Sequence, residues 1–236
     1  MGLKKNQFLD REIVVSSKEK ILEEIINFVK SKKTINIFTL NPETWKKTKQ
    51  FKFGKNVFWI PESISIYYSM IFLGMKPLRV PGFDLVSFLL KHNSFNVVCW
   101  GGKKEDCHKL ISNWSNLDFS SRIIGAFDGF SSNSEEVKEL VNKNKDVILL
   151  VGKGAGVQEK SILEISKDLD SCISFGVGGT LDVFLGKKNR APRFMTHFGF
   201  EYLWRVFFEP KRLIRIINSY PEFFVEVLKN KFCIRK

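Results

Sequence analysis

The sequence lacks three features that define large classes of proteins: paired cysteines, a long apolar run and an apolar leader. Its four cysteines (Cys99, Cys107, Cys172 and Cys233) are scattered with no Cys-x-x-Cys pair, so we expect neither a disulfide framework nor a zinc site. The N-terminal residues have no apolar segment of the signal-peptide type, and the apolar stretch around 66–73 is too short to span a bilayer. These absences predict a cytoplasmic protein that does not cross a membrane.

Acidic residues are too few to balance the basic ones. The 236 residues include 38 lysines and arginines against 25 aspartates and glutamates, which gives a formal net charge of +13. Such an excess indicates an acidic partner, which can be nucleic acid, an anionic membrane surface or a phosphate-bearing substrate. No nucleic-acid recognition motif accompanies the charge, so we expect no nucleic acid among the partners.

The sequence does contain a regular alternation of strands and helices. Strand-like apolar runs cover residues 35–40, 57–60, 96–100, 122–127, 146–151 and 172–176. Helical spacing of apolar residues covers 18–30, 64–73, 105–114 and 134–142, and a further helix ends near 167. Near-continuous apolar strands that alternate with helices are typical of a parallel sheet covered on both faces. The predicted fold class is α/β, with a Rossmann-like parallel sheet as the core.

Glycine clusters follow three of these strands. They lie at 101–102, 152–156 and 176–179. One such cluster is usually only a tight turn, but the carboxyl ends of parallel strands share the edge where α/β proteins bind ligands. The spacing matches neither Gly-x-Gly-x-x-Gly nor a P-loop, so neither motif supports a dinucleotide or Walker-type site. Three clusters on one edge predict a nucleotide-binding rim of another kind.

The last part of the chain is strongly basic. From Val183 to Lys236 there are twelve lysines and arginines but only four acidic residues. Short amphipathic helices are predicted here: one with Leu203, Trp204, Phe207 and Phe208 on one face, one after Pro210 and another after Pro221. They form either a helical cap with a solvated basic face or a surface that docks on an anionic membrane. We therefore divide the chain into a core at 1–190 and a basic helical appendage at 191–236.

No metal site is predicted. The three histidines have no ligand-like spacing, and Asp168-Leu169-Asp170, although similar to a metal-binding Asp-x-Asp pair, precedes its strand. It therefore belongs to the edge of the sheet opposite the glycine rim.

Residues 176–195 (GVGGTLDVFLGKKNRAPRFM) and 199–215 (GFEYLWRVFFEPKRLIR) resemble the closing signature of the WecG/TagA/CpsF glycosyltransferases. Earlier elements fall in that family's order: Thr39-Leu-Asn41, Arg79-Val-Pro-Gly-Phe-Asp-Leu, and Gly152-x-Gly-x-x-x-Gln-Glu-Lys160. The resemblance covers roughly residues 10–217. It implies inverting, metal-independent and cofactor-free transfer from a UDP-sugar, such as UDP-N-acetylmannosamine, to a polyprenyl-diphosphate-linked sugar acceptor. It also implies bacterial cell-surface polysaccharide synthesis by a peripheral protein on the inner face of the cell membrane.

The resemblance also implies which residues act. It assigns catalysis to Thr39 and Glu62. It assigns substrate binding to Asn41, Arg79, Gly101, Gly102, Gly152, Gly154, Gln158, Glu159, Gly176, Gly178, Gly179, Asp182, Arg205, Arg212 and Arg215. For Arg79, a structural ion pair is the alternative to a contact with a diphosphate.

One element departs from the family pattern. The family's catalytic carboxylate lies in a Pro-Asp-Gly-x-Gly element, whereas this chain has Pro61-Glu62-Ser63-Ile64-Ser65. Glu62 keeps a carboxylate but moves it outward by one methylene, and a general base must lie within hydrogen-bond reach of its proton. The alternative to an active enzyme is therefore a catalytically impaired, UDP-binding homologue with a regulatory or scaffolding role.

Overall fold

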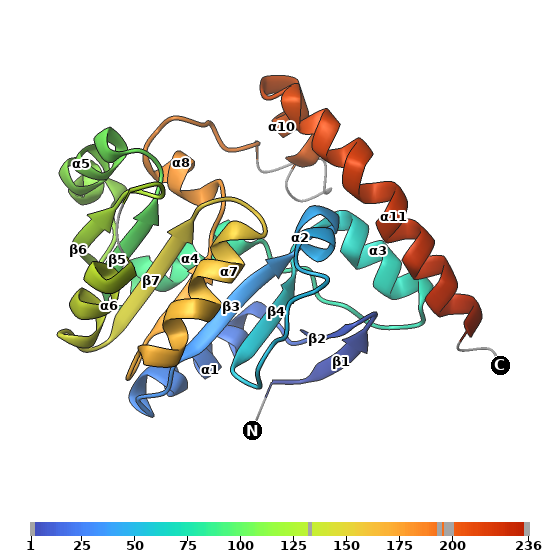
Figure 1. The fold of residues 1–236 in the computed structure, drawn as a ribbon, viewed down its shortest axis with the longest axis horizontal. Coiled ribbons are helices and arrows are strands. Elements are labelled where there is room, and N and C mark those ends of the chain that lie inside the picture. The colour runs from blue at the N-terminus through green and yellow to red at the C-terminus, as the bar shows by residue number, and fades with distance from the viewer. Residues whose placement is uncertain (1–2, 132–133, 193–194, 196–200, 234–236) are drawn as a thin grey trace.

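The computed structural model describes residues 3–131, 134–192, 195 and 201–233, without the side chains of 201–203, 205 and 233. It shows an eight-stranded sheet with helices on both faces (Figure 1). The strand order is β1-β2-β4-β3-β8-β7-β5-β6, and every neighbouring pair is parallel except the antiparallel pair β1–β2. The predicted α/β fold with a Rossmann-like parallel sheet is confirmed.

The strands are β1 (Lys5–Phe8), β2 (Arg11–Val14), β3 (Ile35–Leu40), β4 (Val57–Pro61), β5 (Asn96–Gly101), β6 (Arg122–Phe127), β7 (Val147–Gly152) and β8 (Ile173–Gly176). The α-helices are α1 (Lys18–Lys30), α2 (Pro42–Lys47), α3 (Ile64–Phe72), α4 (Gly82–His92), α5 (Lys104–Asn113), α6 (Ser134–Asn142), α7 (Val157–Ile165), α8 (Thr180–Phe184), α10 (Glu201–Phe208) and α11 (Lys211–Cys233). Two 3₁₀ turns, η1 (Trp114–Leu117) and η2 (Ser166–Asp168), extend α5 and α7. The strands and helices predicted between residues 18 and 176 are all present, with small shifts at their ends.

Alternate side chains of the strands enter two apolar layers, one on each face of the sheet. In β3, Ile35 and Ile37 belong to the layer that includes residues of α1 and α4. Phe38 and Leu40 belong to the other layer, which includes residues of α2, α3, α7 and α11. Because successive side chains of a strand point to opposite faces, a continuous apolar run is what a doubly covered strand needs.

Residues 5–14 form a β-hairpin that the sequence pattern did not predict. Its two strands are four residues each, and Leu9 in the connecting turn has a φ of 52°. The strand β1 is polar except for the buried Phe8, so it shows no apolar alternation. Through β2, which pairs with β4 at Ile13 and Trp59, the hairpin extends the sheet.

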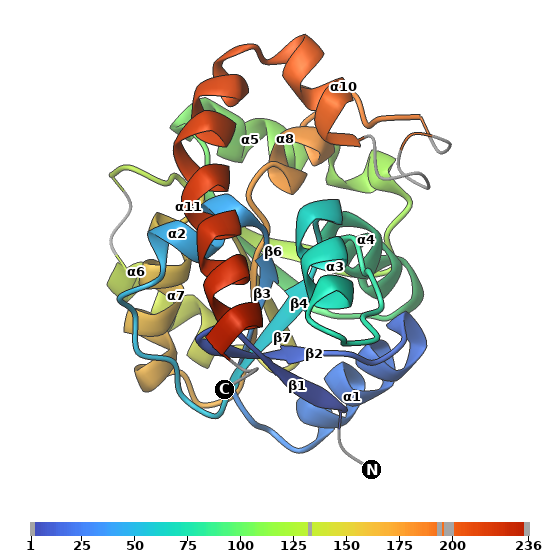
Figure 2. The ribbon, with the colours of Figure 1, turned by 90° about the vertical axis from the view of Figure 1, so that its right-hand side faces the viewer.

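The predicted break between short helices at Pro221 is wrong, because α11 is one continuous helix with Pro221 inside it. Proline in a helix interior removes a hydrogen bond and costs about 3 kcal/mol. Tertiary packing offsets this cost: Phe223 is fully buried, and its ring centroid lies 5.5 Å from that of Trp45. Val227 is buried one turn further on. Figure 2 shows α11 running across the molecule beside α2 and α3.

Candidate active site

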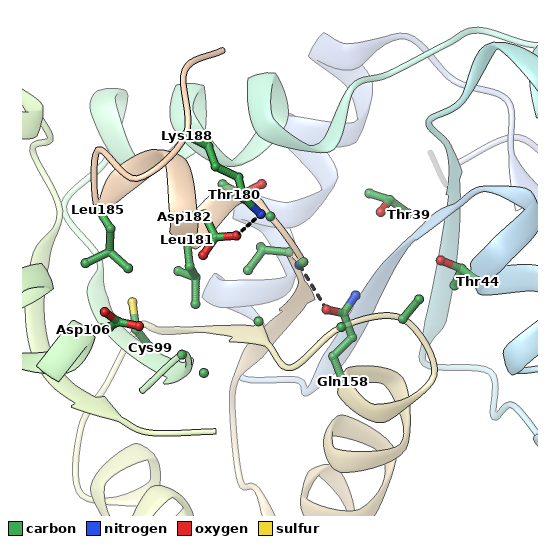
Figure 3. A pocket seen from close by; sticks show the side chains of 18 of the residues that line it. Thr39, Thr44, Cys99, Asp106, Gln158, Thr180, Leu181, Asp182, Leu185 and Lys188 are labelled. Carbon is green, nitrogen blue, oxygen red and sulfur yellow. Dashed lines mark hydrogen bonds and ion pairs between the residues drawn. The ribbon is translucent and has the colours of Figure 1, made fainter. Parts of the chain in front are cut away.

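A cleft of about 270 Å³ opens at the carboxyl edge of the sheet. Figure 3 shows Thr39 and Asp106 on opposite sides of it, with Gln158 and Asp182 between them. Its lining comes from the carboxyl ends of six strands, β3 to β8, and from helices that include α5, α7, α8 and α11. Among the lining residues are Thr39, Asn41, Glu62, Gly101, Gly102, Gly152, Gly154, Gln158, Gly178, Gly179, Asp182, Arg212 and Arg215. The glycine clusters that the sequence places after three strands thus meet at one cleft, as predicted.

One end of the cleft combines a hydroxyl, an amide and a carboxylate. Thr39 lies near the end of β3, and Asn41 follows it as the N-cap of α2. The Asn41 side-chain oxygen accepts a hydrogen bond from the Thr44 N–H at 2.9 Å, which fixes the orientation of the amide. Glu62 follows the neighbouring strand β4, so parallel pairing brings these polar groups to the same edge.

The backbone of Glu62 is held on both sides. Its N–H donates to the Leu40 carbonyl at 3.3 Å, and its own carbonyl accepts from Arg79 Nε at 3.0 Å. Ser63 is the N-cap of α3, and its side chain accepts from the Ile66 N–H at 3.3 Å. The serine that replaces the family glycine after the carboxylate therefore starts a helix. The changed motif makes a fixed loop in which Glu62 lines the cleft.

The glycine loops let the ends of neighbouring strands approach closely. A Cβ atom on Gly101 would lie 2.5 Å from the Gly152 carbonyl oxygen, so β5 and β7 need glycine where they meet the cleft. Gly178, after β8, has a φ of 46°, a conformation that side chains other than glycine adopt at a cost. These positions expose main chain, rather than bulky side chains, to the cleft.

Two adjacent residues of α7 connect the glycine loops. Gln158 Oε1 accepts from the Gly178 N–H at 3.0 Å, and Gln158 Nε2 donates to Glu159 Oε1 at 2.8 Å. The other Glu159 oxygen accepts from the Gly156 N–H at 2.6 Å. Glu159 is fully buried, and this burial raises the pKa of its carboxyl group above the ordinary value. Glu159 thus lies beneath the cleft and holds Gln158, which reaches the cleft.

Cations and carboxylates alternate along the side of the cleft formed by α8 and α11. Lys188 Nζ lies 2.5 Å from Asp182 Oδ2 and 3.2 Å from Glu209 Oε1. Arg212 Nε donates to Glu209 Oε2 at 3.0 Å. Partial burial would raise the pKa of Glu209, but the hydrogen bonds from Arg212 and Lys188 lower it below the ordinary value. Glu209 therefore stays anionic and holds the two cations at the cleft.

Four of the predicted site residues are placed differently from the rest. Arg79, Glu159 and Gly176 do not line the cleft: Arg79 holds the Glu62 loop, and a Cβ on Gly176 would lie 3.0 Å from Gln158 Nε2. The backbone of Arg205 lies in α10, but its side chain is outside the described residues. The binding roles of all these residues stay predictions.

Sequence reasoning missed several residues of the cleft. Asp106, Lys188 and Glu209 line it, and none was assigned a role. Asp106 accepts a hydrogen bond from Lys187, and this bond lowers the pKa of Asp106 below the ordinary value. Lys187 and Lys188 belong to the basic stretch that begins at Val183 in the sequence, but their contacts with carboxylates of the cleft depend on the tertiary fold.

The described residues contain no group of three or more His, Cys, Asp or Glu placed to hold a metal ion. Asp168 lies in η2, before β8, and forms an ion pair with Lys138 at 3.1 Å. It does not line the cleft, which agrees with the predicted position of the Asp168–Asp170 pair at the opposite edge.

Comparison with known proteins gives a consistent result. The sequence model of the glycosyl transferase WecG/TagA/CpsF family matches residues 6–236. A relative from Bacillus spizizenii, named N-acetylglucosaminyldiphosphoundecaprenol N-acetyl-beta-D-mannosaminyltransferase, is 28% identical over 205 residues, which cover 83% of this chain and 79% of the relative. A relative with the same name from Bacillus subtilis is 29% identical over a stretch that covers 65% of this chain and 60% of the relative. Another from Staphylococcus aureus is 30% identical over a stretch that covers 67% of this chain and 63% of the relative. The chain belongs to the glycosyl transferase WecG/TagA/CpsF family.

Proposed function

We propose that this protein is an inverting, metal-independent glycosyltransferase of bacterial cell-surface polysaccharide synthesis. It moves N-acetylmannosamine, or a related sugar, from a UDP-sugar to a lipid-diphosphate-linked acceptor. Family membership and the printed names of the relatives support the reaction class. The observation that carries the proposal is one cleft with Thr39, Asn41 and Glu62 at one end and Arg212 and Arg215 on the α11 side.

The donor end of the proposal uses the glycine loops and the cations. The nucleotide lies against the loops after β5, β7 and β8, where little side-chain bulk intervenes. The departing UDP carries negative charge, which Arg212, Arg215 and Lys188 stabilise in the absence of a metal. Glu209 and Asp182 hold Lys188 in place before the charge develops.

The acceptor end of the proposal uses Glu62 as general base. Its carboxylate takes the proton of an acceptor hydroxyl, and the hydroxyl oxygen attacks the anomeric carbon of the donor. As this bond forms, the bond from the anomeric carbon to the phosphate oxygen breaks and its electron pair leaves with UDP. A single displacement of this kind inverts the anomeric configuration. Thr39 and Asn41, next to Glu62, bind the transferred sugar.

The membrane part of the proposal rests on α11. No helix in the described part of the chain is both long and apolar enough to cross a bilayer. The face of α11 opposite Phe223 is nevertheless apolar and exposed, through Ile214, Ile217, Leu228 and Phe232. The neighbouring helix α3 adds Tyr68, Ile71 and Phe72, which are also exposed. We propose that these two helices rest on the inner face of the cell membrane, where a lipid-linked acceptor is found.

A donor screen tests the function. The purified protein is incubated with UDP-N-acetylmannosamine and other UDP-sugars, together with a short-chain lipid-diphosphate-linked N-acetylglucosamine acceptor, with and without EDTA. We expect UDP release and a disaccharide product with at least one donor, at a rate that EDTA does not change. Normal UDP binding by calorimetry without transfer from any donor would instead support the impaired, UDP-binding homologue.

A further inference from the structure

Gly82, the first residue of α4, lies against two residues of the proposed catalytic end. It is buried, and a Cβ atom at this position would lie 2.6 Å from Thr39 Cγ2 and 3.3 Å from Glu62 Oε1. Gly82 is not among the glycines with positive φ, so its backbone conformation is one that any residue adopts. What this position requires from glycine is therefore space.

We propose that Gly82 is a positioning residue: the absence of its side chain lets the Thr39 hydroxyl and the Glu62 carboxylate share one end of the cleft. This inference deepens the proposed function and rests on it for its catalytic consequence. Oε1 of Glu62 lies beside Gly82, where a methyl group would crowd it.

The backbones around Gly82 cannot easily move apart. Thr39 lies in β3, directly opposite Ile60 of β4, in the middle of the sheet. On the other side, the Val80 N–H donates to the Pro61 carbonyl at 3.1 Å, and the Leu85 N–H donates to the Pro81 carbonyl at 3.1 Å. Since both backbones are fixed by hydrogen bonds, a side chain must yield to any group added at Gly82.

The side chain that yields is Thr39. Its methyl group and its hydroxyl share one Cβ atom, so a rotation about χ1 that removes the 2.6 Å contact also moves the hydroxyl. That hydroxyl belongs to a residue that lines the cleft. A displacement of about 1 Å in a reacting assembly can lower the rate about 100-fold. Gly82→Ala is thus expected to lower kcat with little effect on the nucleotide site.

Rescue by a second substitution distinguishes positioning from a general loss of structure. Thr39→Ser removes Cγ2 but keeps the hydroxyl, so it removes the atom that a Cβ at Gly82 would strike. The experiment compares Gly82→Ala, Thr39→Ser and the double variant. Val86→Ala, which removes buried volume from the same helix away from the cleft, controls for lower stability. Each variant is assayed for kcat and KM, for UDP affinity by calorimetry and for thermal midpoint.

We expect Gly82→Ala to lower kcat about 100-fold at unchanged UDP affinity. The double variant should return to within about threefold of Thr39→Ser, and Val86→Ala should keep its kcat. A double variant no faster than Gly82→Ala, or an equal loss in Val86→Ala, would overturn the inference.

A second readout does not depend on activity. Three-bond couplings from the Thr39 methyl carbon to its own backbone nitrogen and carbonyl carbon, measured by NMR on isotope-labelled protein, report the χ1 rotamer. Gly82→Ala should change this rotamer, whereas Val86→Ala should not, and an unchanged rotamer in Gly82→Ala overturns the inference. Absence of transfer by the unsubstituted protein would count against the proposed function alone, because the rotamer still decides the role of Gly82.

Discussion

If the face of α11 opposite Phe223 docks on a membrane, as proposed, the loss of vesicle affinity on changing that face can be calculated from the exposed fractions of its side chains. Ile214, Ile217 and Leu228 are 62%, 61% and 46% exposed. Full burial of such a side chain is worth about 1.5–3 kcal/mol, so transfer of the exposed part into lipid contributes about 1 kcal/mol per residue. Replacing all three by glutamate should therefore lower the affinity for vesicles by at least about 100-fold, since 1.4 kcal/mol corresponds to tenfold.

The assay is co-sedimentation with phosphatidylglycerol vesicles. A matched control places three glutamates at exposed positions of α5 and the following turn η1, namely Ile111, Ser112 and Ser115, so that the net charge changes equally. The helix α5 lies on the opposite side of the molecule from α11 (Figure 1). The α11 variant should lose vesicle binding and keep its UDP affinity, and the control should keep both apart from a small electrostatic effect. If the α11 variant sediments with vesicles as the unsubstituted protein does, or if the control loses binding equally, this face of α11 is not the docking surface.

Three further predictions concern stability. Phe223→Ala should cost about 3–5 kcal/mol of unfolding free energy in urea because Phe223 is fully buried, whereas Phe224→Ala should cost about 1 kcal/mol because that residue is 43% exposed. Equal losses would contradict the packing of α11. Burial raises the pKa of Glu159 above 4.5, so between 4.5 and the raised pKa the folded protein holds a proton that the unfolded chain has released. The free energy of unfolding should therefore fall as the pH rises through this range, and Glu159→Gln should remove that dependence on pH. An unchanged dependence in Glu159→Gln would show that Glu159 does not cause it. Ser63→Ala should lower the unfolding free energy, measured by thermal unfolding, by about 1 kcal/mol because α3 loses its N-cap, and Ser63→Gly should lower it by only about a few tenths of a kcal/mol. No loss of stability in Ser63→Ala would show that the cap is dispensable.

The central sheet was predictable because its strands are buried on both faces and need continuous apolar sequence. Runs such as 147–151 leave little choice of structure once helices flank them. The hairpin at 5–14 was not predictable, since β1 has a polar surface and gains its place only by extending the sheet from β4. At Pro221 the local rule was overridden, because burial of Phe223 stabilises a helix that proline alone would interrupt.

The cleft was predictable in outline for a topological reason. Parallel strands end at one edge, so glycine clusters that follow several strands meet there whatever the details of the fold. The side chains that complete the cleft were not predictable from spacing alone. Lys188 and Glu209 lie far apart in the sequence, and only the tertiary fold brings them into an ion pair. Likewise, the contact between Gly82 and Thr39 exists only because α4 begins beside the end of β3.

The rate of sugar transfer by the Glu62→Gln variant decides whether Glu62 is the general base of a glycosyltransferase. Glutamine matches the size of glutamate but does not accept the acceptor's proton at neutral pH, so the fold and the cleft should be retained. Single-turnover transfer from the best donor, with UDP affinity measured by calorimetry on the same samples, separates chemistry from binding. We expect unchanged UDP affinity and a rate of transfer at least about 100-fold lower, in line with the loss of a general base. A Glu62→Gln protein that transfers sugar as fast as the unsubstituted protein would contradict this role of Glu62.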